Sequence, residues 1–298
     1  MLKSLSAKNR EVRAVWRITI NLGHKRNPSS DKTFLGKQNH DICTVSYAIH
    51  NQGIANQMSI SVEKSDSRFQ KRNITLDVLR TLAIVLMVVF HFMYDLKFFG
   101  WVQWAVPDGA GWKQFRYLIL SLFFISLGIS MVMAHSARIK WRAFSIRIMQ
   151  IALGAGAITL LTLFMVPKHW IYFGVLHFII VASLLALAFV SRPKLALCTG
   201  LALIILFNLG VLNSVWPFTS IKHLLPSYSN DYVGVFPWIG VVLIGIWLGH
   251  TESLKNDPLK GVIKKDSWLN VPGQHSLIIY LVHQPIFFAL MGLVSVII

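Results

Sequence analysis

Arg80 and His91 are ionisable side chains inside the first strongly apolar stretch of the sequence. Eleven residues make about three turns of an α-helix, so the two side chains share one face and lie roughly 16 Å apart along the axis. Asp77, Tyr94 and Asp95 fall on the same side of that helix. Ionisable groups in an apolar span are costly, so the pattern predicts a functional face that contacts protein or water.

Histidine can take and return a proton near neutral pH, and two further histidines lie in later apolar stretches. His177 lies at a depth close to that of His91, and the two could share a cavity, although a lone histidine can also bridge helices by a hydrogen bond. The last stretch carries a polar stripe at helical spacing, formed by Ser276, Tyr280, His283 and Gln284. We expect this stripe to form a substrate or cofactor wall, with a structural polar seam as the alternative.

Three other features have both a functional and a structural explanation. Asp231 lies at the outer mouth of the sixth apolar stretch, where it could join the site or remain a solvated charge. Arg147 lies in the inner half of the third stretch, where it could meet an anionic ligand or extend to lipid headgroups. The glycines at 240, 245 and 249 are best explained by close helix packing.

The motifs that the sequence lacks narrow the chemistry. It contains no P-loop, no G-x-G-x-x-G, no H-E-x-x-H and no G-x-S-x-G serine elbow. Cys43 and Cys198 lie far apart and have no metal-ligand spacing, so we expect no metal. Acid–base or acyl-transfer chemistry centred on histidine, or proton-coupled transport, remains.

Composition places the chain in a membrane. Of its 298 residues, 54% are hydrophobic and only 14% are charged, so the expected partner is a lipid bilayer. The net charge of +17 suggests nucleic acid at first, but basic residues that collect in cytoplasmic loops explain it more simply. We therefore expect no nucleic-acid partner.

Seven apolar windows approach the length of about 20 residues that a membrane-spanning helix needs. They cover residues 74–96, 117–134, 146–166, 170–190, 195–212, 232–249 and 275–297. The sequence therefore predicts an all-α, polytopic membrane bundle of about seven transmembrane helices.

The basic residues near the ends of these windows predict the orientation. Fourteen Lys and Arg lie on the side of the N-terminus and five on the opposite side. Because Lys and Arg favour cytoplasmic loops, we expect a cytoplasmic N-terminus in a multi-pass protein of the cell (inner or plasma) membrane.

The first 71 residues differ from the rest. They are basic, rich in Asn, Ser, Lys and Gly around residues 21–57, and contain no window long enough to span a bilayer, so we expect disorder. Met58 begins a natural-looking cytosolic leader, and we hypothesise that translation starts there, so that residues 1–57 are not translated. Residues 72–298 form the predicted membrane domain.

Several segments of that domain resemble one known family. The run RNITLDVLRTLAIVLM at 72–87, with FHF at 90–92 and DL at 95–96, resembles the first span of the heparan-alpha-glucosaminide N-acetyltransferase catalytic-domain family. FGVLH at 173–177, FPWIGVVLIG at 236–245 and HSLIIYLVHQP at 275–285 resemble its bacterial members. The spacing of Arg80 and His91 also matches the R-x10-H signature of the wider membrane acyltransferase superfamily.

The resemblance implies transfer of an acetyl or other acyl group from cytosolic acyl-CoA to a sugar amine or hydroxyl. His91 would be the general base or transient acyl acceptor, and Arg80 would face the acyl donor. Asp95 would orient His91, while His177 and His283 would line the cavity. The predicted binding residues are Asp77, Tyr94, Arg147, His177, Asp231, Tyr280, His283 and Gln284.

One departure from the family limits what carries over. Eukaryotic members have an active histidine in the outer loop after the first span, and residues 97–116 contain none, so the acetyl-glucosamine specificity is not transferred. A proton-coupled transporter and a non-catalytic membrane protein remain as alternatives. A homodimer is a further possibility that no residue pattern supports.

Overall fold

The computed structural model describes residues 73–226, 228–229, 231–263 and 267–297, and within them the chain is helical with no β-strand. This confirms the predicted all-α class. The predicted segment 1–71, with its hypothesised start at Met58, lies outside the described residues. The helices are α3 (Ile74–Phe98), α4 (Trp112–His135), α5 (Trp141–Met165), α6 (Val175–Ala186), α7 (Pro193–Asn208), η1 (Phe218–Leu224), α8 (Trp238–Gly249), α9 (Glu252–Lys255), η2 (Trp268–Asn270), α10 (Val271–Gln274) and α11 (Ser276–Ile297).

Each of the seven predicted windows overlaps one apolar helix. Four of these helices, α3, α4, α5 and α11, have 22 to 25 residues and are long and apolar enough to cross a membrane. The chain is therefore a membrane protein. The other three, α6, α7 and α8, have only 12 to 16 residues, and how many helices cross the bilayer stays a prediction.

The fourth and sixth windows overestimate their helices because apolar loops precede both. Ile171 and Phe173 are buried before α6, and Val233 and Val235 are buried before α8, all in non-helical backbone. The two loops meet, since the N–H of Val233 donates to the carbonyl of Phe173 at 3.3 Å. A hydropathy window counts such buried loop residues as part of a span.

Helices α4, α7 and α8 form the most closely packed part of the described chain, and glycines allow it. A Cβ on Gly128 of α4 would lie 2.2 Å from the carbonyl oxygen of Val242 in α8, and one on Gly245 would lie 2.5 Å from that of Ile125. On the other side of α8, the backbones meet at Gly240 and Gly200 of α7. The predicted packing role of the α8 glycines is thus found at Gly240 and Gly245, and also at Gly249, where a Cβ would lie 3.2 Å from Ile129 Cα of α4.

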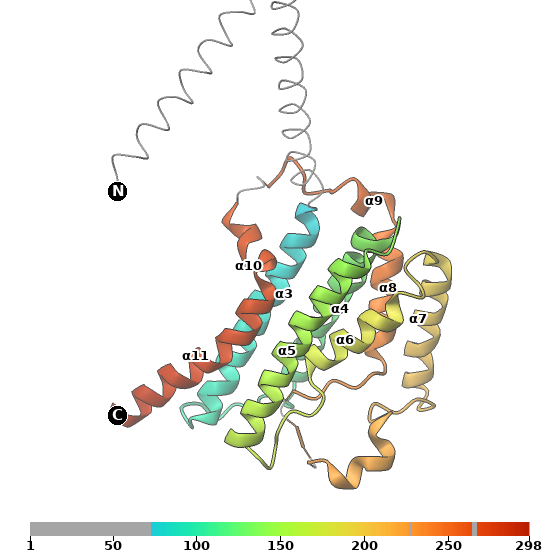
Figure 1. Ribbon diagram of the computed structural model, residues 1–298. Coiled ribbons are helices and arrows are strands. Elements are labelled where there is room, and N and C mark those ends of the chain that lie inside the picture. The colour runs from blue at the N-terminus through green and yellow to red at the C-terminus, as the bar shows by residue number, and fades with distance from the viewer. Residues whose placement is uncertain (1–72, 227, 230, 264–266, 298) are drawn as a thin grey trace, which may run out of the picture. The chain divides into compact units, whose positions relative to one another are not determined.

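Helix α11 runs beside α3, so that the last helix of the chain packs against the first described one (Figure 1). The short helix α10 packs on the beginning of α3, where the N–H of Gly273 donates to Thr81 Oγ1 at 2.9 Å. A Cβ on Gly273 would lie 2.1 Å from the carbonyl oxygen of Asp77, so only glycine permits this approach. The contact fixes how α11 enters the bundle and which of its residues face α3.

Candidate functional site

The facing sides of α3 and α11 bring His91 and His283 together. Their ring centroids lie 4.8 Å apart in an edge-to-face arrangement, although 192 positions separate the residues in the sequence. Both side chains are half-buried. The apolar residues Phe90 and Phe287 contact the two rings from either side, with centroid distances of 5.7 Å to His91 and 6.2 Å to His283.

Backbone carbonyls orient both imidazoles and define their tautomers. His91 Nδ1 lies 2.9 Å from the Met87 carbonyl oxygen, and His283 Nδ1 lies 2.8 Å from that of Tyr280. A carbonyl oxygen can only accept, so each Nδ1 must carry the proton. In the neutral ring, Nε2 then holds the lone pair, and no described residue hydrogen-bonds to either Nε2 atom. The site therefore contains two adjacent bases with unoccupied lone pairs.

Asp95 and Gln284 extend the same interface by one helical turn. Asp95 is fully buried, and its Oδ1 accepts a hydrogen bond of 2.7 Å from Gln284 Nε2. Asp95 Oδ2, Gln284 Oε1 and His283 Nε2 are buried polar atoms that have no hydrogen-bond partner among the described residues. Asp95 thus bonds to Gln284, while the Met87 carbonyl orients His91. Unpartnered buried acceptors are costly and invite a hydrogen-bond donor from a ligand.

Asp231, in the loop before α8, bonds to the polar stripe of α11. Its Oδ2 accepts a hydrogen bond of 2.8 Å from the Tyr280 hydroxyl and one of 3.2 Å from the N–H of Val175. The stripe predicted for the last window therefore faces protein at three of its four members, Tyr280, His283 and Gln284.

Arg80 and Asp77 lie near the beginning of α3, away from the histidines. Arg80 Nη2 donates to Ser130 Oγ of α4 at 2.5 Å, and Nη1 lies 3.6 Å from Asp77 Oδ1. The Arg80 side chain keeps 20% of its surface exposed. Sequence reasoning missed Ser130, although Ser126 and Ser130 at i and i+4 in an apolar helix were a visible signal.

Asp257, in the loop between α9 and η2, holds the first turn of α3 in place. Its carboxylate accepts hydrogen bonds from the N–H groups of Ile74 and Thr75 at 2.8 and 2.9 Å and from Thr75 Oγ1 at 2.6 Å. Burial would raise the pKa of Asp257, but these hydrogen bonds hold the pKa below its usual range. Such a contact between distant segments has no local sequence signal.

His177 and Arg147 lie apart from the two-histidine pair. His177 Nδ1 accepts from the N–H of Gly174, the residue that caps α6, at 3.2 Å. Its Nε2 lies 3.2 Å from Thr159 Oγ1 of α5, so both ring nitrogens have partners. Arg147 is exposed on α5. The predicted cavity shared by His91 and His177 stays a prediction, since His283 is the histidine in ring contact with His91.

Tyr94 occupies a third position, toward the loops that follow α3 and η1. It is half-buried at the end of α3, one residue before Asp95, and within electrostatic reach of Tyr228 and Asp108. It therefore borders the same polar interface from the side of the loops that follow α3 and η1.

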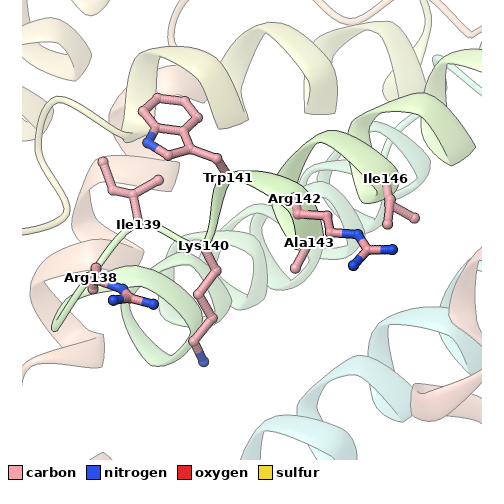
Figure 2. Close-up of a pocket in the computed structure, with 7 residues that line it drawn as sticks. All are labelled: Arg138, Ile139, Lys140, Trp141, Arg142, Ala143 and Ile146. Carbon is pink, nitrogen blue, oxygen red and sulfur yellow. The ribbon is translucent and has the colours of Figure 1, made fainter.

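The turn between α4 and α5 forms a recess of about 720 Å³, lined by Arg138, Ile139, Lys140, Trp141, Arg142, Ala143 and Ile146. Its three basic side chains fan apart rather than meet at one point (Figure 2). Ser130, the partner of Arg80, lies five residues before α4 ends, or roughly 7.5 Å along the helix. The recess and Arg80 thus lie toward the same end of α4.

The long apolar helices define a membrane protein. Among the described residues, no group of three or more His, Cys, Asp or Glu side chains is placed to hold a metal. Residues 72–285 match the family described as heparan-alpha-glucosaminide N-acetyltransferase, catalytic, and the chain belongs to that family. The family is one of transferases. No curated protein and no solved structure matches the chain.

Proposed function

We propose that this chain is a multi-pass membrane acyltransferase that moves an acetyl or other acyl group from acyl-CoA to a sugar amine or hydroxyl. The observation that carries the proposal is the His91–His283 pair, in which backbone carbonyls fix both Nδ1 atoms and leave both Nε2 lone pairs free. A general base needs a lone pair at an atom that substrate can reach. Family membership supports the reaction class.

His91 is the proposed base. His283 Nε2 is enclosed by protein, so contact with the acceptor falls to His91. The acceptor gives its N–H or O–H proton to His91 Nε2 and forms a bond from nitrogen or oxygen to the thioester carbonyl carbon. The carbon–sulfur bond then breaks, and the proton passes from His91 to the departing thiolate. No net proton is consumed, and the products are the acylated acceptor and coenzyme A. A transient acyl group on His91 is the variant of this step that a nucleophilic histidine permits.

The acyl donor is proposed to enter from the end of the bundle that carries Arg80. Arg80 is held in place by Ser130 and Asp77, and it supplies a fixed positive charge between the α4–α5 turn and the histidines. The phosphates of coenzyme A would be attracted by the basic residues of that turn and of the helix after it, namely Arg138, Lys140, Arg142 and Arg147. With the proposed cytoplasmic N-terminus in the cell membrane, the donor is cytosolic and the acceptor, a saccharide or glycoconjugate, is external.

The test is acyl transfer by the purified full chain in lipid nanodiscs, with labelled acetyl-CoA and a panel of amino sugars and hexoses. We expect His91→Ala to lose transfer by at least about a hundredfold while its thermal unfolding is unchanged. The control is His275→Ala, because His275 is exposed just before α11 and has no contact with the pair. Retained transfer in His91→Ala refutes the assignment of the base. Substrate flux without an acylated product would instead indicate a proton-coupled transporter.

A further inference from the structure

Tyr280 lies where three apolar clusters of the described chain meet. It packs against the large core of α4, α6 and α8, against the cluster around Ile84 and Phe90 on α3, and against the cluster of Ile151 and Leu176 between α5 and α6. A ring held from three sides has little freedom to change its rotamer. The one polar atom of this ring donates to Asp231 at 2.8 Å.

Asp231 is itself fixed at the beginning of α6. The same Oδ2 accepts the N–H of Val175, the first residue of that twelve-residue helix. A Cβ on Gly174 would lie 2.7 Å from Oδ2, so glycine is needed for the carboxylate to approach. A negative charge is favourable at this end of a helix, where unpaired N–H groups point outward.

The chain of contacts continues from Tyr280 to the histidines. The backbone carbonyl of Tyr280 accepts His283 Nδ1–H at 2.8 Å, and the Tyr280 and His283 ring centroids lie 5.9 Å apart. His283 in turn contacts His91, with 4.8 Å between centroids. Asp231 also lies within electrostatic reach of His283, so its negative charge would favour the positive charge that a proton brings to the pair.

We propose that Asp231 is a positioning residue that acts through Tyr280 to set the place of His283, and through His283 the edge-to-face contact that orients His91. The inference rests on the proposed function, because it assigns a role within the same site. The proposal also assigns different roles to the residues of the polar stripe of α11. Tyr280 anchors the helix to Asp231 and α6, while His283 and Gln284 face α3.

The test compares the variants Asp231→Asn and Tyr280→Phe and their double mutant in the purified full chain. Each substitution keeps the size of the side chain and removes either the charge or the hydroxyl. We expect each single variant to lower kcat by about tenfold or more, because a small displacement of a catalytic group is costly. We expect KM for acetyl-CoA to change by less than about twofold, since the donor is proposed to enter from the end of the bundle that carries Arg80. The double mutant should resemble the single variants, because both break one chain of contacts.

Asp257→Asn is the matched control. Asp257 also caps a helix through its carboxylate, at the beginning of α3, but does not contact Tyr280 or the histidines. It should lose thermal stability and keep kcat. Additive effects of Asp231→Asn and Tyr280→Phe, or an equal loss of kcat in Asp257→Asn, would overturn the proposal.

A second measurement separates this inference from the proposed function. Diethyl pyrocarbonate modifies accessible imidazoles. Mass spectrometry of the digested protein measures how fast the peptide that contains His283 is modified. In the wild-type chain His283 Nε2 is enclosed, so modification should be slow, and it should become faster in Asp231→Asn and Tyr280→Phe but not in Asp257→Asn. If the wild-type chain transfers no acyl group, the proposed function fails, and the modification rates alone decide the inference. Unchanged rates would then overturn it.

Discussion

The α4–α7–α8 region and the α3–α11 interface are built on opposite principles. In the first, glycines let backbones touch, and buried apolar side chains such as Phe124 and Leu243 fill the space between them. In the second, two histidines, a carboxyl group and an amide face each other, and three buried polar atoms lack partners among the described residues. The comparison indicates that packing stabilises the fold in one region, while the other keeps energetically unfavourable polar groups where we propose that the chemistry takes place.

The largest effect is expected where the packed region is broken. Gly128→Val places side-chain atoms against the backbone of α8, because even a Cβ at this position lies 2.2 Å from the Val242 carbonyl oxygen. We expect a loss of about 3 kcal/mol or more of stability, measured as the yield and thermal unfolding of the purified protein. The control is Gly156→Val on α5, where an added Cβ meets nothing within 4 Å. Equal stability of the two variants would contradict the packing role of Gly128.

The second effect is expected at the polar interface and in activity rather than stability. His283→Phe keeps a ring against His91 but removes Nδ1 and Nε2. We expect transfer to fall by about a hundredfold, equivalent to about 2.7 kcal/mol in the barrier, with thermal unfolding unchanged or raised. Initial rates and differential scanning measurements on the same preparation give both quantities. A parallel fall in activity and unfolding temperature would mean that His283 belongs to the structural region after all.

The sequence predicts which residues share a helix face, but it does not predict which residues of different helices are in contact. Helical periodicity alone places Arg80 and His91 on one face of α3, and Tyr280, His283 and Gln284 on one face of α11. It cannot pair His91 with His283, because that contact depends on how α10 leads the chain onto α3 at Gly273. Long-range contacts of this kind leave no local pattern.

The same limit explains the helix boundaries. The first window, 74–96, begins with α3 and ends only two residues before it. The agreement is close because the hydrophobic run and the helix cover nearly the same residues there. The sixth window, 232–249, begins six residues before α8, because Val233 and Val235 are apolar for burial in a loop rather than for a helix. A hydropathy window detects buried apolar residues. It therefore predicts the bounds of a helix only where no buried loop adjoins that helix.

A third effect is expected at the loop that caps α3. In this loop both carboxylate oxygens of Asp257 have hydrogen-bond partners, unlike the polar atoms of the α3–α11 interface. Asp257→Asn weakens three hydrogen bonds and should cost up to about 2 kcal/mol. The lowered pKa of Asp257 gives the cap a pH dependence. Its stabilisation is complete above the unfolded pKa of about 3.9 and is lost as pH falls through the still lower folded pKa. Thermal unfolding of the wild type and Asp257→Asn should therefore differ at pH 7 and converge in acid below about pH 3; a constant difference would contradict the cap.

The smallest expected effect concerns the buried carboxyl group of the α3–α11 interface. Asp95→Asn keeps an oxygen that can accept from Gln284 and replaces the unpartnered Oδ2 with a neutral amide group. Because no described cation pairs with Asp95, removing the charge should stabilise the protein by about 1 kcal/mol, seen as a raised unfolding temperature. Transfer should fall at the same time, since the substitution removes a negative charge that lies about one helical turn from His91. A stabilised but less active Asp95→Asn would show directly that this interface trades stability for function, whereas a destabilised variant would place Asp95 with the structural groups.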